Sequence, residues 1–135
     1  MKGKLFAALF AAVSIVVVSL PLLAHHSRSS YDSKHQMTVT GTVTEFDFVN
    51  PHIIIHMQSK DENGQTVEWL AEGAPPNNMR RAGWTKYTLK PGDQVTLTVQ
   101  LPKNPAKGGA RDAFVQKVTM NGKDLYFADR GDNNN

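Results

Sequence analysis

The stretch Asn50-Pro-His-Ile-Ile-Ile-His-Met57 carries the clearest structural signal in the chain, and the other elements can be placed around it. A proline cannot donate to a central strand ladder, so we expect Pro51 at a strand boundary. The residues after it alternate between two faces with the period of a strand. We predict that the buried face carries Ile53, Ile55 and Met57 and that the other face carries His52, Ile54 and His56.

The sequence after this strand predicts a hairpin, a helix and two more strands. Asn63-Gly64 is typical of a tight hairpin turn and places a strand at 66–72. Pro75-Pro76 ends that strand, and we expect Asn77 or Asn78 to cap a short helix that Gly83 closes. The remaining expected elements are a half-buried strand with Val95, Leu97, Val99 and Leu101 on its buried face, a loop at 102–111, a strand at 113–120 and a terminal segment at 124–128.

The sequence before Asn50 predicts a long first strand at 37–49. Its apolar residues keep one parity up to Val43 and change it from Phe46 onward, which indicates a β-bulge or sharp bend near Thr44 and Glu45. Three strands, a helix and two strands is the element order of an OB-type barrel. We therefore predict an all-β fold with one short helix, a small five-stranded OB-type barrel, and we keep a small open β-sandwich as the alternative.

The first 24 residues have the pattern of a secretory signal peptide. Lys2 and Lys4 precede an apolar run that extends to Leu23, and Ala24 supplies a small residue for cleavage. An uncleaved anchor helix is the alternative. Cleavage leaves 111 of the 135 residues, which we divide into an N-terminal arm at 25–36, a single OB-like domain at 37–128 and a disordered polar tail at 129–135.

The composition of the mature chain limits its partners and its location. Without the two signal lysines, 13 basic residues face 12 acidic ones, so the net charge is +1 and nothing favours nucleic acid as a partner. The absence of cysteine excludes disulfides, a cysteine-based zinc site and a lipoprotein anchor. We expect a periplasmic or secreted protein with no membrane contact after cleavage, and the sequence leaves its oligomeric state open.

Several short motifs together resemble a family of small secreted bacterial proteins of unknown function. The motifs are Ala24-His-His-Ser27, Gly41-Thr-Val43, Asn50-Pro-His52, and Arg81-Ala-Gly-Trp-Thr85 followed by Leu89-Lys-Pro-Gly-Asp93. Members of that family often have an aromatic residue where this chain has Arg28 and another where it has Ile54. The resemblance implies export and a small β-barrel, and it brings no established activity.

The histidines suggest a copper site at the processed N-terminus. Cleavage after Ala24 would make His25 the first residue, and a free α-amine with a pKa of about 7.7–8.0 is available as a ligand near neutral pH. A set of nitrogen donors suits Cu(II). We predict that His25 supplies amine and imidazole, that His26 is an alternative donor, and that His52 reaches the site from the barrel.

His52 and His56 are not expected to bind one metal together. They share a strand face at a separation of about 13 Å, whereas metal–nitrogen bonds are about 2.0–2.1 Å long. We favour His52 because it lies at the corner beside Pro51, where a folded-back arm could reach it. The alternatives are a solvated histidine tail that binds copper adventitiously, a His52 that bonds a backbone group, an exposed or packed strand position for His56, and a solvent-exposed His35.

Each of the other groupings of polar and aromatic residues can be explained by a structural role as well as by a functional one. The carboxylate pairs Glu45/Asp47 and Glu68/Glu72 are each interpreted as a solvated sheet face rather than an acid–base pair. The two tryptophans, Trp69 and Trp84, are expected to pack in the core or at its rim. A basic group around the predicted helix could meet an anionic ligand or headgroups, or simply be solvated: Arg80, Arg81, Lys86 and Lys90.

Three functions are compatible with these patterns. The leading hypothesis is a non-enzymatic exported binding module that holds copper and has no catalytic residues. The second is a structural or adaptor barrel that binds a protein or a glycan and whose histidines are incidental. The third is a copper-dependent redox enzyme, which would need an open coordination position and a substrate surface that no sequence feature demonstrates.

Overall fold

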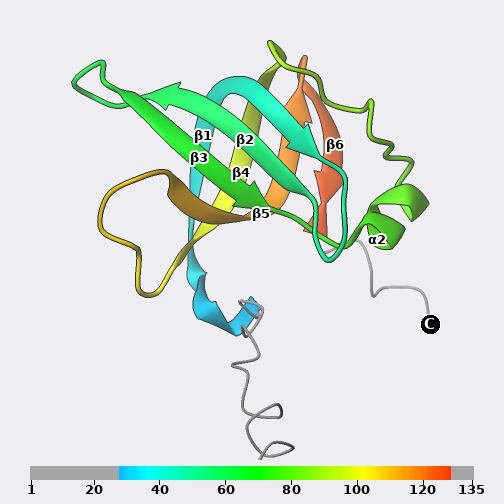
Figure 1. Cartoon of the computed structure of the whole chain (residues 1–135), viewed down its shortest axis with the longest axis horizontal. Coiled ribbons are helices and arrows are strands. Elements are labelled where there is room, and N and C mark those ends of the chain that lie inside the picture. Colours follow the sequence, from blue (N-terminus) through cyan, green and yellow to red (C-terminus); the bar gives the residue numbers. More distant parts are fainter. Residues whose placement is uncertain (1–27, 129–135) are drawn as a thin grey trace, which may run out of the picture.

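A computed structural model describes residues 28–128, which form an all-β barrel with one short α-helix (Figure 1). The predicted signal peptide, residues 25–27 of the predicted arm and the predicted tail at 129–135 lie outside the described residues. Within the described range, no helix is long and apolar enough to cross a membrane. The elements in chain order are η1 (Arg28–Ser30), β1 (Tyr31–Asp47), β2 (Ile54–Lys60), β3 (Thr66–Glu72), α2 (Pro76–Arg81), β4 (Gln94–Pro102), β5 (Arg111–Met120) and β6 (Lys123–Phe127).

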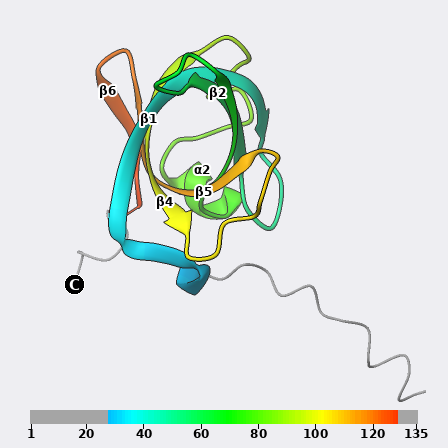
Figure 2. The ribbon, with the colours of Figure 1, turned by 90° about the vertical axis from the view of Figure 1, so that its left-hand side faces the viewer.

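Parallel pairing of β3 with β5 closes the sheet into a barrel. The strand order is β3-β2-β1-β4-β5-β6, with antiparallel pairing between neighbours, and the β3–β5 pairing joins the two sides. Figure 2 shows the strands arranged around a closed ring. The sixth strand, β6, lies outside the ring and pairs with β5. The predicted five-stranded OB-type barrel is therefore confirmed, and the open β-sandwich is wrong.

The predicted bulge in the first strand is present and lets β1 serve both sides of the barrel. Val43 lies opposite Met57 and Glu45 lies opposite His56, so Thr44 is the additional residue of β1. On the N-terminal side of the bulge β1 pairs with β4, and around and beyond it β1 pairs with β2. The change of side-chain parity follows from this one inserted residue.

The start of β1 differs from the prediction. The strand begins at Tyr31, six residues before the expected Met37. Tyr31 is only 6% exposed and lies opposite Pro102, whereas residues 33–36 are exposed and have no apolar period. A periodicity argument therefore misses this segment, although it belongs to the barrel.

The core is built from the alternating residues of the central strands. Ile53, Ile55 and Met57 are each at most 1% exposed, which confirms the predicted buried face. In β4 the register shifts at Val99, Gln100 becomes buried, and Leu101, which was predicted to be buried, is 38% exposed. Both tryptophans are buried as expected, and their indole N–H groups donate to the Ser59 hydroxyl and the Leu125 carbonyl.

The short helix α2 is defined by its C-terminal end. Neither Asn77 nor Asn78 caps it: the cap position is Pro75, which makes no side-chain cap bond. Gly83 follows the helix with φ +84°, its N–H donates to the Arg80 carbonyl, and the next N–H, of Trp84, donates to the Met79 carbonyl. This is a Schellman arrangement. It holds Met79, which is fully buried, in the core of the barrel.

Gly41 is a position where β1 and β2 leave no room for a side chain. A Cβ atom there would collide with the Gln58 carbonyl oxygen and would lie 2.9 Å from Met57 Cγ. Because the closest atom belongs to the backbone, we expect Gly41→Ala to lower the free energy of unfolding by about 2 kcal/mol or more. That loss corresponds to a fall in Tm of about 10 °C. Thermal unfolding monitored by circular dichroism measures it.

The matched control for this variant is Thr38→Ala, at an exposed position of the same strand. A surface substitution of this kind should change the free energy of unfolding by less than about 0.5 kcal/mol. A Gly41→Ala protein as stable as the control would contradict the close approach of β1 and β2.

Candidate functional site

His52 lies at the corner before β2 and contacts the last residue of β3. Its Nδ1 is 2.6 Å from Glu72 Oε1, and both side chains are about a quarter exposed. Two backbone hydrogen bonds extend the pairing past the strand ends: Ile53 N–H donates to the Ala74 carbonyl, and Gly73 N–H donates to the Ile53 carbonyl. These bonds fix the corner, and His52 is thereby held against Glu72.

Glu72 also binds the first residue of β1. The hydroxyl of Tyr31 donates to Glu72 Oε2 at 3.3 Å, and the ring of Tyr31 packs against Phe114 with a centroid separation of 5.4 Å. Each carboxylate oxygen of Glu72 therefore has one partner, and the carboxylate joins the start of β1, the corner before β2 and the end of β3. We call these three residues the Tyr31–Glu72–His52 cluster.

The cluster has two electrostatic consequences. Burial raises the pKa of Tyr31 to about 12, with added contributions from the charge of Glu72, its hydrogen bond with Tyr31 and the charge of Asp112. A carboxylate only accepts hydrogen bonds, so neutral His52 carries its proton on Nδ1 when it donates to Glu72. Its other nitrogen, Nε2, then presents a lone pair to a ligand.

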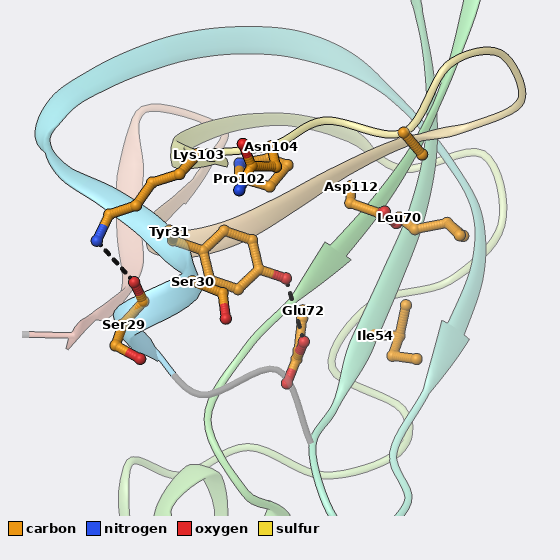
Figure 3. Close-up of a pocket in the computed structure, with 11 residues that line it drawn as sticks. Ser29, Ser30, Tyr31, Ile54, Leu70, Glu72, Pro102, Lys103, Asn104 and Asp112 are labelled. Carbon is orange, nitrogen blue, oxygen red and sulfur yellow. Dashed lines mark hydrogen bonds between the residues drawn. The ribbon is translucent and has the colours of Figure 1, made fainter. Parts of the chain in front are cut away.

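A pocket of about 640 Å³ adjoins the cluster on the outer face of the barrel (Figure 3). Ile54 lies opposite Glu72 across β2 and β3, and Leu70 lies opposite Asp112 across β3 and β5, so these four residues share that face. The β4–β5 loop and η1 complete the wall, where Lys103 Nζ donates to the Ser29 carbonyl at 2.8 Å. The lining residues are Ser29, Ser30, Tyr31, Ile54, Leu70, Glu72, Pro102, Lys103, Asn104, Ala106 and Asp112.

The other histidines are not gathered at this place. His25 and His26 lie outside the described residues. His56 Nε2 lies 2.9 Å from Asp47 Oδ2, and the exposed His35 has its Nδ1 2.7 Å from Asp32 Oδ2. The hydrogen bond with His35 lowers the pKa of Asp32. Among residues 28–128, no three His, Cys, Asp or Glu side chains form a group able to hold a metal.

The remaining polar groupings lie on the surface. Glu68 accepts a hydrogen bond from the Gln58 side chain at 2.6 Å on an exposed face, as a solvated carboxylate does, and Glu45 is exposed. The basic group of Arg80, Arg81, Lys86 and Lys90 is also exposed, and the Arg80 guanidinium lies 5.2 Å from the centre of the Phe48 ring.

Sequence reasoning missed Tyr31, Asp112 and the role of Glu72. Tyr31 was assigned to a polar arm, and Glu72 was paired with Glu68 on a solvated face. The Tyr31–Glu72 contact spans 41 residues of sequence, and no local pattern reports it. A lone aromatic residue in an otherwise polar segment was the only available signal for Tyr31.

The raised pKa of Tyr31 predicts how stability depends on pH. In the unfolded chain its hydroxyl ionises near pH 10, whereas in the folded protein it holds its proton until about pH 12. Between these values the unfolded state binds fewer protons, so this contribution to stability is complete below pH 10 and is lost as the pH rises to 12. We expect Tyr31→Phe to reduce the decline of the denaturation midpoint over that interval.

Two measurements check this expectation. Denaturant unfolding at several pH values gives the decline for the parent and for Tyr31→Phe, with Tyr87→Phe at an exposed position as the matched control. The difference in tyrosinate absorbance between parent and Tyr31→Phe should titrate well above pH 10. A difference titration centred at pH 10 would contradict the burial of the Tyr31 hydroxyl beside Glu72.

Comparison with known proteins identifies the family of the chain. Residues 12–113 match the family of unknown function DUF6152. No curated protein matches the chain. Among solved structures, the chain is similar to a small single-stranded DNA-binding protein from Streptomyces coelicolor, with 16% identity, a TM-score of 0.42, and coverage of 64% of this chain and 91% of that one. The family match spans most of the sequence, and the chain therefore belongs to the family of unknown function DUF6152.

Proposed function

We propose that this protein is an exported binding module that holds Cu(II) at its processed N-terminus. Cleavage after Ala24 would give His25 a free α-amine beside its own imidazole, with His26 as an alternative donor. His52 completes the set from the barrel. Three nitrogen donors of this kind match the preference of Cu(II) for nitrogen ligands.

The contact between His52 and Glu72 is the observation that carries the proposal. Histidine ligands of metals commonly donate their second ring N–H to a carboxylate, which fixes the tautomer and raises the basicity of the coordinating nitrogen. The Nδ1–Oε1 distance of 2.6 Å fits this arrangement and leaves Nε2 for the metal. Tyr31 in turn donates to the other oxygen of Glu72 and restricts its rotation.

The position of η1 supports His52 as the barrel ligand. Ser29 and Ser30 line the pocket that Glu72 also lines, so the polypeptide leaves η1 close to the partner of His52. Only three residue steps separate His25 from Arg28, and they span at most about 10–11 Å. The described chain therefore begins, at η1, on the side of the barrel on which Glu72 holds His52.

The other placed histidines are poorer candidates. His56, in β2, uses Nε2 to contact Asp47 of β1, and His35 lies on the exposed part of β1 with Asp32. Glu72, the carboxylate partner of His52, lines the pocket beside η1, whereas Asp47 and Asp32, the partners of His56 and His35, do not. We therefore assign the barrel ligand to His52.

The test uses the protein exported by its native host, with its intact mass determined first. A chain that starts at His25 should bind one Cu(II) in competition with a chelator of known affinity. We expect Glu72→Gln to weaken this binding by about 10–100-fold and His52→Ala to weaken it at least as much. Electron paramagnetic resonance should show one nitrogen fewer on copper in His52→Ala, while His35→Ala and His56→Ala serve as matched controls.

Several outcomes would overturn the proposal. A mature start other than His25 would remove the chelating amine. An unchanged copper affinity after one residue is added before His25 would show that the amine is not a ligand. Loss of binding in the control variants as well would indicate adventitious copper. Binding that depends on His25 but not on His52 would exclude the barrel ligand.

A further inference from the structure

The pocket beside the Tyr31–Glu72–His52 cluster has the size and walls of a small-molecule site. Its volume of about 640 Å³ falls within the usual range for ligand pockets. It also lies where OB-type barrels bind their ligands, on the outer face of β2 and β3 and against the β4–β5 loop. The apolar part of the lining comes from Ile54, Leu70, Pro102 and Ala106.

The charged groups of the pocket favour a cation. Glu72 and Asp112 both line it, and the carboxylate of Asp112 makes no side-chain hydrogen bond or salt bridge with any residue between 28 and 128. The one lysine of the lining, Lys103, directs its ammonium to the Ser29 carbonyl. Figure 3 shows this ammonium pointing away from Asp112 and Glu72. Two carboxylates on the binding face oppose a phosphate chain, the ligand that many OB barrels take.

We infer that this pocket binds a small organic cation that has an ammonium group and an apolar body. The ammonium lies between the Glu72 and Asp112 carboxylates, where it forms charge-assisted hydrogen bonds. The apolar body covers Ile54 and Leu70, which is 36% exposed, beside the ring of Tyr31. The inference goes beyond the copper proposal and does not require copper: Glu72 contributes to both, but it is a partner of His52 rather than a proposed metal ligand, and Asp112 belongs to the pocket alone.

Three probes that share a phenylethyl group and differ in charge test the inference: 2-phenylethylammonium, neutral 2-phenylethanol and anionic 3-phenylpropanoate. Each is titrated into isotope-labelled, metal-free protein at low salt with a chelator present, and amide chemical shifts are followed. We expect the ammonium probe to bind at least about fivefold more tightly than the alcohol, and the anion not to bind. The shifts should centre on Tyr31, Ile54, Leu70 and Asp112.

Asp112→Asn removes one charge at an exposed position and keeps the side-chain shape. We expect it to weaken binding of the ammonium probe by about fivefold or more. Glu68→Gln is the matched control, because Glu68 lies on the same face of β3 outside the pocket. It should bind as the parent does, and thermal unfolding confirms that both variants fold.

Equal binding of the three probes, no binding of any of them, or an unchanged affinity in Asp112→Asn would overturn the inference. Repeating the titration with His25→Ala separates the two proposals. If this variant fails to bind copper but still prefers the ammonium probe, the cation-site inference stands independently of the copper site. If the parent protein binds copper but shows no preference for the ammonium probe, only the cation-site inference is overturned.

Discussion

The parallel pairing between β3 and β5 is the constraint on which the rest of the structure depends. The other pairings join antiparallel neighbours and would leave an open sheet with two edges. The pairing of Trp69 with Arg111 through Glu72 with Phe114 closes that sheet and buries a core between its two sides. It is also a non-local pairing, so it costs more loop-closure entropy than a hairpin does, and it brings β5 beside the outer face of β3. The barrel and its outer pocket therefore arise together.

Closure also determines the chemistry of the outer surface. It places Leu70 beside Asp112 and Glu72 beside Phe114, and the ring of Phe114 supports Tyr31. A carboxylate at a strand end would ordinarily be solvated. Here Glu72 instead accepts from a buried tyrosine and contacts a histidine, because three chain segments meet at the closing edge. The same edge thus gives both the orientation of His52 and the negative charge of the pocket.

The features predicted correctly from sequence are those with a local cause. Strand alternation identified Ile53, Ile55 and Met57 as core, and the parity change around Thr44 identified the bulge, because both patterns repeat within a few residues. The helix end at Gly83 followed from a glycine that takes a positive φ. His52 could be proposed from its place beside Pro51, but its partner Glu72 is 20 positions away and belongs to another strand.

The features that were missed depend on tertiary contacts. Tyr31 is buried because Phe114 and Glu72 lie beside it, and neither is near it in sequence. Leu101 is exposed where the alternation of β4 breaks, with Val99 and Gln100 both buried, beside the register shift between β4 and β5 that the sequence of β4 alone does not report. Site chemistry in this fold is thus set where strands meet, while each strand's own pattern determines only which residues form the core. Glu72 illustrates this most clearly. The strand pattern it shares with Glu68 predicts a solvated carboxylate. In the folded protein it lies where three chain segments meet, and the proposed metal ligand and the proposed cation site both depend on it.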